Sequence, residues 1–510
     1  MGLKSQMEVE AKFSVSTDTE VPDLLEIPQV EKIVSTRTHH LSALYFDTDD
    51  LRLTRSKVTV RRRTGGSDDG WHIKFPGKGG RLEVHHPIVG GDGVPAEIYS
   101  MVRSIARGKE LVPIAQVDNE RVETLLGNAD GEVIAEFCDD HVTARSLISD
   151  TPTSWREWEL EITPETPAKF IACATPTLKQ AGAAASKSPS KLAMALGADL
   201  PTEPASVDID PNSPAAGVLA ALKRNRDKLL AYDPRVRQDE WDSIHQMRVA
   251  TRELRSHLQS FAGILAGNQH KNVEEQLKQL ATILGVARDA EMIAERFKDL
   301  CEQHPSGIIN EENTKQLYDS MIAEYGAAHQ RVVVALNDDK YLQLLNELDD
   351  LISHPELAET EDTPPAESVL VSHLADSFKV LAKRHKKAMK AWDGHSALRP
   401  QQEQKFHNVR KATKKLRYTT EAVGDATDID TTELYQACKA LQEVLGDFQD
   451  SVTSREKLVK KSDQAFQRGE NTFIYGVLYE TEVELSRQIL QDYPAAFSAV
   501  SRAYKRLQQE

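Results

Sequence analysis

The sequence predicts an α+β protein of two domains, in which a β-rich N-terminal part precedes a purely helical part. Short segments that alternate apolar and charged residues run through the first 200 residues, which is typical of strands with two different faces. Segments with a 3.6-residue period fill residues 215–510, as expected of amphipathic helices. One basic helical pattern occurs twice in this second part, at an offset of 407 − 245 = 162 residues.

The overall composition limits the class of protein. A chain of 510 residues is too long for one core and predicts several domains. Its 63 Lys and Arg against 79 Asp and Glu leave a net charge of −16, which disfavours a whole-molecule attraction to nucleic acid or membrane. Four scattered cysteines and the lack of a membrane-length apolar run or signal peptide predict a cytoplasmic protein without disulfides. The sequence leaves a homodimer open.

Five segments of the N-terminal part carry the alternation: MEVEAKF, VTVRRR, WHIKF, RLEVH and WREWELEI. Each places apolar side chains on one face of a strand and charged ones on the other. The charged faces carry Glu8, Glu10, Lys12, Arg61, Arg63, His72, Lys74, Arg81, Glu83, His85, Glu157, Glu159 and Glu161. A half-exposed antiparallel sheet accounts for any one of these strands alone. If the sheet closes, the charged faces would line a polar lumen.

A lumen of this composition suits phosphate chemistry. Closely spaced carboxylates favour a hard divalent cation such as Mg²⁺ or Mn²⁺, and arginine and lysine favour phosphate oxygens. A metal beside a cationic lining is what phosphoryl transfer requires.

The order of these motifs resembles that of CYTH domains, the triphosphate tunnel metalloenzymes. The resemblance covers about residues 5–200 and includes YFDT at 45–48 and the SPSK segment that ends at Lys191. It implies an eight-stranded antiparallel tunnel that binds a triphosphate and Mg²⁺ or Mn²⁺. Metal binding and catalysis would fall to Glu8, Glu10, Glu159 and Glu161, with Glu157 as a further metal ligand. Triphosphate binding would fall to Lys12, Arg61, Arg63, Lys74, Arg81 and Arg121.

A proline-containing polar segment separates the two parts. Residues 201–214 read as a linker between a domain at 1–200 and a domain at 215–510. The helical domain is expected to contain two repeats, at about 215–360 and 367–510, with a proline-containing break near 363–366. Each repeat would carry a basic lead helix, a helix with a His/Arg strip and a helix with a Leu-Gly…Asp motif.

The His/Arg strip is clearest in the predicted helix Ser243–Phe261. His245, Arg248, Arg252 and Arg255 fall within an arc of roughly 80° on that helix, and His407, Arg410, Lys414 and Arg417 repeat the spacing. A solvated face accounts for one such strip. Two strips in register indicate binding of an extended anion. Like charges stacked along a helix cost a few tenths of a kcal/mol per pair, and a bound anion would offset that cost. Two bundles packed about a pseudo-twofold axis would bring both strips to one groove.

The helical part resembles the CHAD (conserved histidine α-helical) domain over about residues 210–505. The resemblance rests on HQMRVATRELR from His245, on LGVARDAEM with Arg288, and on HNVRKATKKLRY from His407. It implies binding of inorganic polyphosphate without hydrolysis by this domain. The candidate residues are Lys223, Arg226, His245, Arg248, Arg252, Arg255, Arg288, Lys386, His407, Arg410, Lys411, Lys414 and Arg417. Gln449 stands where the first repeat has Arg288, so the two repeats are expected to contribute unequally.

Three functions stay open at this point. The first is hydrolysis of a triphosphate, with inorganic tripolyphosphate favoured, next to a polyphosphate-binding platform. The second is a non-catalytic polyphosphate-binding or localisation protein. The third is a nucleotide or thiamine triphosphatase, or a cyclase, with the same kind of tunnel. Nucleic acid is disfavoured, because no aromatic side chains interleave the basic strips for stacking. The two histidines either carry a proton beside phosphate or only pack at the helix starts.

Overall fold

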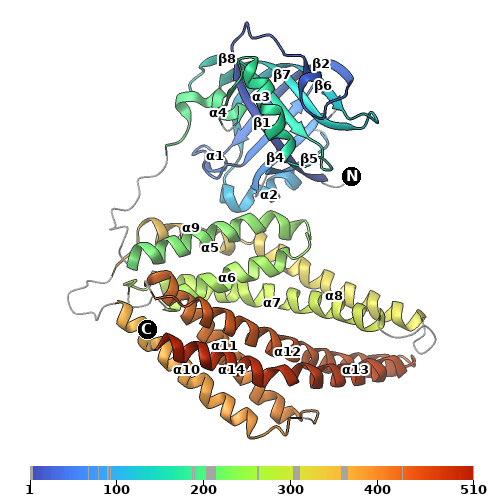
Figure 1. Cartoon of the computed structure of the whole chain (residues 1–510), viewed down its shortest axis with the longest axis vertical. Helices are drawn as coiled ribbons and strands as arrows, with labels where there is room; N and C mark the ends of the chain where they lie inside the picture. The colour runs from blue at the N-terminus through green and yellow to red at the C-terminus, as the bar shows by residue number, and fades with distance from the viewer. Residues whose placement is uncertain are drawn as a thin grey trace. The chain divides into compact units, whose positions relative to one another are not determined.

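The chain divides into two compact units, Met1–Ala205 and Ser206–Glu510, which Figure 1 shows in blue to green and in green to red. The computed structural model describes residues 4–508, except for 67, 78–79, 89–90, 92, 187, 189, 203–213, 261–263, 303–310, 358–365, 395 and 428. The predicted linker at 201–214 and the predicted break at 363–366 fall almost entirely outside the described residues, so both stay predictions.

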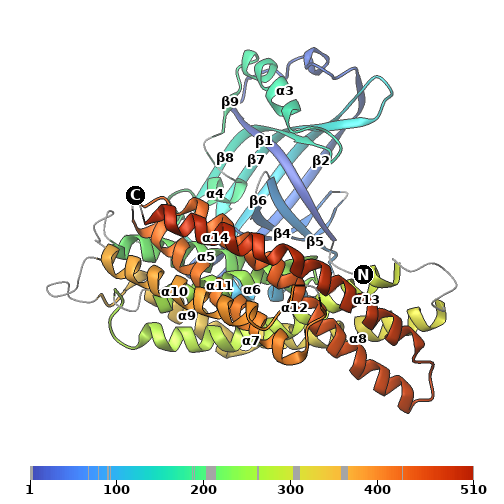
Figure 2. The ribbon, with the colours of Figure 1, turned by 60° about the horizontal axis from the view of Figure 1, so that its bottom comes forward.

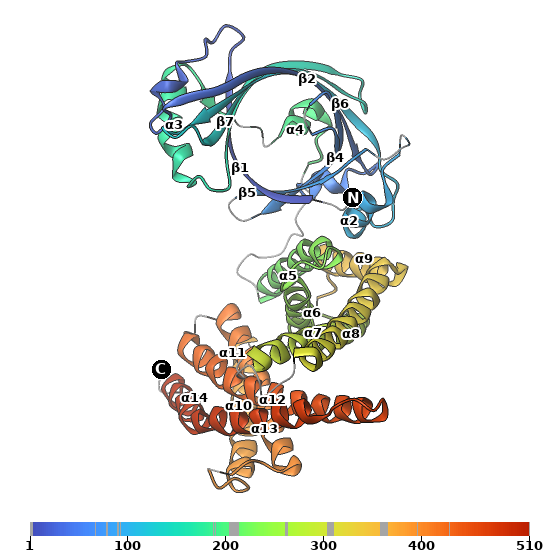
Figure 3. The ribbon, with the colours of Figure 1, turned by 90° about the vertical axis from the view of Figure 1, so that its right-hand side faces the viewer.

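In the described residues of the first unit, eight strands close into an antiparallel barrel. They are β1 (Lys4–Val15), β2 (Lys32–Asp47), β3 (Thr59–Thr64), β4 (Gly70–Gly77), β5 (Gly80–His86), β6 (Val112–Gly127), β7 (Val133–Ser146) and β8 (Pro152–Ile162). Their order is β5-β4-β3-β2-β6-β7-β8-β1, the short β9 (Ala184–Ala185) adds to β1, and pairing of β1 with β5 closes the ring (Figures 2 and 3). The predicted eight-stranded antiparallel tunnel is therefore confirmed.

Two helices cover the outside of the barrel wall. The first unit also contains α1 (Arg52–Arg55), α2 (Ala96–Ala106), α3 (Lys169–Gln180), α4 (Lys191–Leu196), η1 (Leu24–Glu26) and η2 (Gly197–Asp199). The buried face of α3 joins a core with Trp158 and Phe137, and that of α2 joins a core with Trp71 and Ile73. Side chains alternate between the two faces of a strand. Since these apolar residues occupy the outer face of the wall, the charged residues between them face inward.

The helix α4 lies inside the barrel outline (Figure 3). Its N-cap is Ser190, whose hydroxyl accepts a hydrogen bond from the Ala193 N–H at 3.1 Å. Its buried leucines, Leu192 and Leu196, pack on apolar side chains of the wall. These wall residues include Ala43, Tyr45, Val117, Val142 and Ala144. The helix therefore fills one end of the lumen, and its first residue, Lys191, reaches the charged interior.

The second unit is helical throughout its described residues. Its elements are α5 (Pro214–Arg237), α6 (Ser243–Ser260), α7 (Gln269–Glu302), α8 (Glu311–Asn337), α9 (Asp339–Ser353), α10 (Ala366–Met389), α11 (Pro400–Ala426), α12 (Thr432–Gln467), α13 (Phe473–Ile489), η3 (Leu490–Asp492) and α14 (Tyr493–Leu507). The long helix α7 packs on α6, α8 and α9, and α12 packs in the same way on α11, α13 and α14. A single apolar core runs through both groups of helices. The two predicted His/Arg helices lie in α6 and α11.

Two further expectations concern the chain as a whole. All four cysteines carry free thiols, which agrees with the expected lack of disulfides. Within the described ranges, none of the helices combines the length and the hydropathy of a membrane span. The cytoplasmic location and the homodimer stay predictions.

Candidate functional site

The lumen of the barrel contains a cavity of about 220 Å³ that is lined mainly by charged side chains. Its carboxylates, among the described residues, are Glu8, Glu10, Asp68, Glu83, Glu123, Glu136, Glu159 and Glu161. Its amino and guanidinium groups are those of Lys12, Arg61, Arg63, Lys74, Arg121 and Lys191. The carboxylates exceed the cations by 8 − 6 = 2. A polyanion can therefore be accommodated only together with added cations.

The structure brings most of the predicted tunnel residues together at this cavity. Those that line it are Glu8, Glu10, Lys12, Arg61, Arg63, Lys74, Arg121, Glu159 and Glu161. Arg81 lies directly opposite Glu8 in the β1–β5 ladder, so it shares the inner face of the sheet but is not a lining residue. Glu157 is not a lining residue, and its carboxylate belongs to a polar cluster around Lys191. The roles of all these residues as ligands stay predictions.

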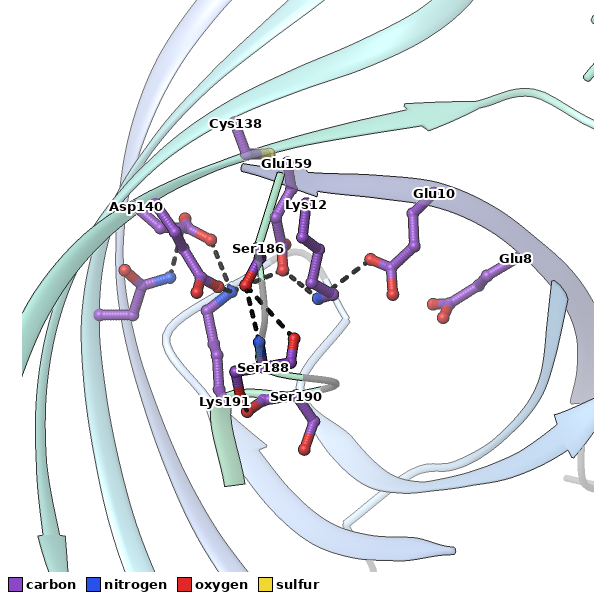
Figure 4. Close-up of polar contacts among 12 residues, drawn as sticks. Glu8, Glu10, Lys12, Cys138, Asp140, Glu159, Ser186, Ser188, Ser190 and Lys191 are labelled. Atoms are coloured by element: carbon purple, nitrogen blue, oxygen red, sulfur yellow. Dashed lines mark hydrogen bonds and ion pairs between the residues drawn. The ribbon is translucent and has the colours of Figure 1, made fainter. Parts of the chain in front are cut away.

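That polar cluster contains three buried carboxylates, Asp140, Glu157 and Glu159, around the ammonium group of Lys191. Figure 4 shows Asp140, Glu159 and Lys191. Ligand oxygens of Asp140, Glu157 and Glu159 all lie within 4.8 Å of one another. The Lys191 Nζ lies 2.7 Å from Asp140, 2.6 Å from Glu157 and 2.7 Å from Glu159. Burial lowers the pKa of Lys191, but the three carboxylates outweigh burial and the net pKa is raised. Lys191 thus already supplies the positive charge that this group of acids needs, which disfavours a metal among them.

Glu159 is held by further cations of the tunnel. Lys12 binds both Glu159 and, at 3.2 Å, Glu10, and Arg121 donates to Glu159 and to Asp140, the latter at 2.8 Å. Burial opposes ionisation of Glu159, yet attraction to Lys12, Lys191 and Arg121 holds its pKa well below the usual range. Glu159 therefore fixes the positions of the cations.

A second group of carboxylates has fewer cations around it. Glu10 lies directly opposite Glu161, and Glu161 directly opposite Glu136, so β1, β8 and β7 present three acids at one level. Burial raises the pKa of Glu161 to about 7; Lys74 opposes this shift, and repulsion from Glu10 and Glu136 adds to it. Like charges placed directly across strands destabilise a sheet. Glu10 is paired with Lys12 at 3.2 Å and Glu136 lies 3.8 Å from Arg121, so three carboxylates share only two nearby cations. Carboxylate oxygens gathered in this way fit Mg²⁺ or Mn²⁺, so the residues present suit the metal that the fold implies.

Glu8 sits beside this group and is paired with Glu83. Lys74 Nζ lies 2.6 Å from Glu8 and 3.9 Å from Glu83, and His72 Nδ1 lies 2.9 Å from Glu83. Burial, followed by the hydrogen bond with Glu83, raises the pKa of Glu8 to about 8. Glu8 therefore tends to keep its proton near neutral pH, and a cation bound beside it would favour the ionised carboxylate instead.

The guanidinium groups form the opposite kind of surface. Burial, followed by repulsion from Arg61 and Arg121, lowers the pKa of Arg63 to about 9. The Nε atoms of Arg61 and Arg63 are buried and lack a hydrogen-bond partner among the described residues. An unsatisfied buried donor costs about 1–3 kcal/mol. These donors are therefore ready to bind an anion.

Several lining residues were not predicted as site residues from the sequence. They are His39, Tyr45, Glu83, Glu123, Glu136 and Lys191, and Asp140 lies beside them. Glu136, Cys138 and Asp140 alternate along β7, so the pattern that identified the other strands could have found this one too. From the sequence, Lys191 could be recognised only as the last residue of the SPSK motif. Its contact with the three carboxylates depends on how α4 enters the barrel.

In the second unit, the two basic strips face one another across α6 and α11. The guanidiniums of Arg252, from α6, and Arg417, from α11, lie over the same Tyr418 ring, at 5.5 Å and 5.0 Å from its centroid. We call the group formed by Arg248, Arg252, Arg410, Lys414 and Arg417 the basic groove. Burial, followed by repulsion from these four arginines, with Arg410 and Arg252 foremost, lowers the pKa of Lys414 to about 7.

The repeat is visible in the way the first arginine of each strip is seated. A Cβ at Gly285 of α7 would lie 3.8 Å from Nε of Arg248, and one at Gly446 of α12 would lie 4.0 Å from an Nη of Arg410. A glycine inside a helix costs about 1 kcal/mol relative to alanine. At both positions a Cβ would make only an ordinary contact with the guanidinium, so the two glycines mark equivalent places where the first arginine of each strip lies against the neighbouring helix.

The basic groove also holds buried donors without partners. The Nε atoms of Arg252, Arg410 and Arg417 and the hydroxyl of Tyr418 are buried and lack a hydrogen-bond partner in the described part of the chain. The space between the two repeats thus contains both cations that repel one another and buried donors without hydrogen bonds. A bound polyanion would reduce the repulsion and accept hydrogen bonds from these donors.

The other predicted polyphosphate residues are arranged less favourably. Arg226 is paired with Asp349, Arg255 with Glu274 at 2.8 Å and Arg288 with Glu291 at 2.7 Å. Lys223, Lys386 and Lys411 are exposed at the surface. Nδ1 of His407 lies 2.7 Å from the Gln449 amide oxygen. Burial, followed by repulsion from Arg288, lowers the pKa of His245, so Arg288 and Gln449 do give the two histidines different surroundings.

Comparison with known proteins agrees with this architecture. The CYTH domain model matches residues 6–195 and the CHAD domain model matches residues 220–459. Two Mycobacterium tuberculosis proteins, from strains CDC 1551 and H37Rv and both named as uncharacterized, are each 35% identical to the chain over 517 residues, which cover 98% of this chain and 97% of each relative.

Solved structures show lower similarity. The CHAD domain from the plant Ricinus communis is 19% identical, covers 59% of this chain and 96% of its own, and has a TM-score of 0.44. A Hippeastrum protein described as having a dominant triphosphatase activity is 18% identical, covers 38% of this chain and 96% of its own, and has a TM-score of 0.26. Since the two M. tuberculosis relatives align over nearly the whole chain and both domain models match in order, the chain belongs to the family of proteins in which a CYTH domain is followed by a CHAD domain.

Proposed function

We propose that the tunnel hydrolyses a terminal phosphoanhydride bond of a triphosphate, and that inorganic tripolyphosphate is its favoured substrate. The observation that carries this proposal is the division of one cavity into two surfaces. Arg61 and Arg63 form a cationic surface with unmet Nε donors, and Glu10, Glu161 and Glu136 form an acidic surface with few cations. The first surface suits phosphate oxygens, and the second suits a divalent cation.

Substrate binding would exchange the partners of two lysines. In the free protein Lys12 is paired with Glu10 and Lys74 with Glu8. When the substrate enters with its cation, these lysines turn to the phosphate oxygens and release the carboxylates. The helix α4 fills one end of the lumen and limits how deeply the triphosphate can enter. The chain therefore orients the terminal phosphate and excludes bulk water from it.

The metal would be held mainly by Glu10 and Glu161, with Glu8 beside them. When bound, Mg²⁺ or Mn²⁺ supplies positive charge to the phosphate oxygens and lowers the pKa of water. Glu159 would act through Lys12, Arg121 and Lys191, whose positions it fixes.

The first prediction is that phosphate release from tripolyphosphate requires Mg²⁺ or Mn²⁺ and the acids of the tunnel. Glu10→Gln and Glu161→Gln are each expected to lower kcat by at least about 100-fold, because several kcal/mol of transition-state stabilisation depend on the metal. The assay measures phosphate with and without metal. The matched control is Glu120→Gln, since Glu120 lies on β6 but its side chain is 57% exposed on the outer face, and this variant should keep full activity.

The same assay separates the alternatives. Metal-dependent turnover that is no higher in the wild type than in the two glutamine variants would leave a non-catalytic, phosphate-gripping tunnel. Faster hydrolysis of ATP or thiamine triphosphate than of tripolyphosphate would favour a nucleotide or thiamine triphosphatase. Release of pyrophosphate with a cyclic nucleotide from ATP would identify a cyclase.

We further infer that the helical unit binds inorganic polyphosphate along the basic groove. The cations between the two repeats include buried donors without hydrogen-bond partners among the described residues. Their mutual repulsion also helps to lower the pKa of Lys414. A chain of phosphates would satisfy the donors and remove the repulsion, and the match to the CHAD domain model supports this ligand.

The second prediction is that polyphosphate binding takes up a proton at Lys414. The pKa of Lys414 is about 7 in the free protein, and adjacent phosphate charge must raise it. The affinity is therefore highest below the free pKa and falls as the pH rises from about 7 toward 9, by at most tenfold per pH unit. Titration calorimetry in buffers of different ionisation enthalpy measures the proton directly. Lys414→Arg keeps the charge at every pH, and it should abolish both the uptake and this fall in affinity.

A further inference from the structure

The lumen contains an ionisable pair, His39 and Glu123, that has no role in the reaction proposed above. His39 of β2 and Glu123 of β6 both line the cavity. Nε2 of His39 lies 3.3 Å from a carboxylate oxygen of Glu123, and each side chain is 19% exposed. The same Nε2 is buried and has no hydrogen-bond partner among the described residues. The Glu123 carboxylate is therefore next to a ring nitrogen that makes no hydrogen bond among the described residues.

The chemistry of this pair differs from that of the rest of the lining. Among the described residues at the cavity, His39 is the only imidazole. Imidazole is the side chain that most often accepts or donates a proton in catalysis. A carboxylate beside one ring nitrogen favours the tautomer with the proton on that nitrogen. The other nitrogen is then left as a base, as in the serine protease triad. Here the carboxylate is next to Nε2, so the free base would be Nδ1.

The surrounding charges suit a proton acceptor. Arg121 lies directly opposite His39 in the β2–β6 ladder, so a phosphate held by Arg121 would lie near the imidazole. Glu123 stabilises the imidazolium that forms when the ring accepts a proton. Glu136 of β7, which lies 3.8 Å from Arg121, is a further charged group on this part of the wall.

We propose that His39, oriented by Glu123, accepts the proton of the attacking water in triphosphate hydrolysis. This inference rests on the proposed function of the tunnel. The water oxygen forms a bond to the terminal phosphorus while the anhydride P–O bond breaks and leaves its electron pair on the departing pyrophosphate. The water proton passes to Nδ1 of His39, and the imidazolium later returns it to a product phosphate or to solvent. No oxidant, reductant or further reactant takes part.

The test compares His39→Ala with His40→Ala in the full chain. His40 is the neighbouring residue, but its side chain is 80% exposed, so its removal should leave hydrolysis unchanged. His39→Ala is expected to lower kcat by roughly 10²- to 10⁴-fold, as for other general bases, with little change in KM. Added imidazole should restore part of the activity, which a purely structural role would not allow. Glu123→Gln should lower kcat less and weaken the acidic limb of the pH profile of kcat.

The outcomes distinguish this inference from the function on which it rests. A wild-type protein that hydrolyses tripolyphosphate, together with a His39→Ala variant of unchanged kcat, would overturn the role of His39 alone. A fall in kcat that imidazole does not restore, accompanied by weaker tripolyphosphate binding in calorimetry, would also overturn it and indicate a substrate-binding role. Lack of hydrolysis by the wild type would overturn the proposed function and this inference together.

Discussion

Lys191→Met is expected to lower the free energy of unfolding of the tunnel domain by about 3–5 kcal/mol near neutral pH, because removing one partner of a buried ionic cluster leaves its other charges uncompensated. Methionine keeps the length of the side chain but removes the ammonium that lies within 2.7 Å of Asp140, Glu157 and Glu159. Calorimetry or urea unfolding of the full chain would measure the loss in the transition of the first domain.

The effect of Lys191→Met should depend on pH in a definite direction. In the wild type, attraction to Lys191 and Arg121 holds the pKa of Asp140 low despite its burial, and Glu159 is similarly lowered. The stability that these groups contribute is present above the unfolded pKa of about 4 and is lost only in stronger acid. Without Lys191, Asp140 and Glu159 lose one of the cations that offset their burial, so their pKa values move upward from the low values of the wild type. The variant therefore loses less stability than the wild type as the pH falls. The difference between the two proteins should shrink accordingly.

A surface lysine provides the control for the Lys191 prediction. Lys109 pairs with Asp49 at 2.8 Å but is 39% exposed, so Lys109→Met should change the stability little. If Lys191→Met unfolds no more easily than Lys109→Met at neutral pH, the three carboxylates do not depend on Lys191 for their charge balance.

The local sequence pattern was sufficient to predict the wall of the tunnel. Alternation separated Trp71 and Ile73, which are now in an outer core, from His72 and Lys74 on the inner face. It did so because one face of each strand must be buried under a helix while the other meets the lumen. The recurrence of the His/Arg pattern likewise predicted two strips, since helical periodicity is a local property.

The ion-pair partner of each charged side chain could not be predicted from the sequence. It depends on how the barrel closes and on which residues, distant in sequence, come to lie next to one another. Glu157 and Glu159 belong to the same alternating segment, yet Glu157 is bound by Lys191 while Glu159 is also bound by Lys12 and Arg121. The entry of α4 brings Lys191 to both acids, and the strand register that places Lys12 opposite Glu159 makes part of the difference. Successive side chains of a strand point to opposite faces, so the side chain of His40 is 80% exposed and that of His39 only 19%. Its neighbour Glu123 comes from a strand 84 residues away in sequence (123 − 39).

The double variant Arg252→Glu, Lys414→Glu is expected to weaken binding of long-chain polyphosphate by at least about 100-fold, since charge-assisted contacts contribute about 1.5–3 kcal/mol each. It removes one cation from each repeat and places a carboxylate in the path of the phosphates. The negative slope of log affinity against log salt should also decrease by about two, because two counterion-releasing contacts are lost. The folded state should tolerate the change, since the new acid at position 414 would lie among Arg248, Arg410 and Arg417, which now repel the lysine.

A second double variant with the same change in net charge isolates the effect of position. Lys278 and Lys439 are 53% and 52% exposed and pair with acids on their own helices, so Lys278→Glu, Lys439→Glu should reduce affinity only through the weak long-range field. Hydrolysis of tripolyphosphate should be unaffected in both double variants, because neither changes the tunnel. Equal losses of affinity in the two would mean that polyphosphate responds to the overall charge of the helical domain. A loss confined to the Arg252 and Lys414 variant would require contact with the basic groove, where unpartnered donors of both repeats meet among the described residues.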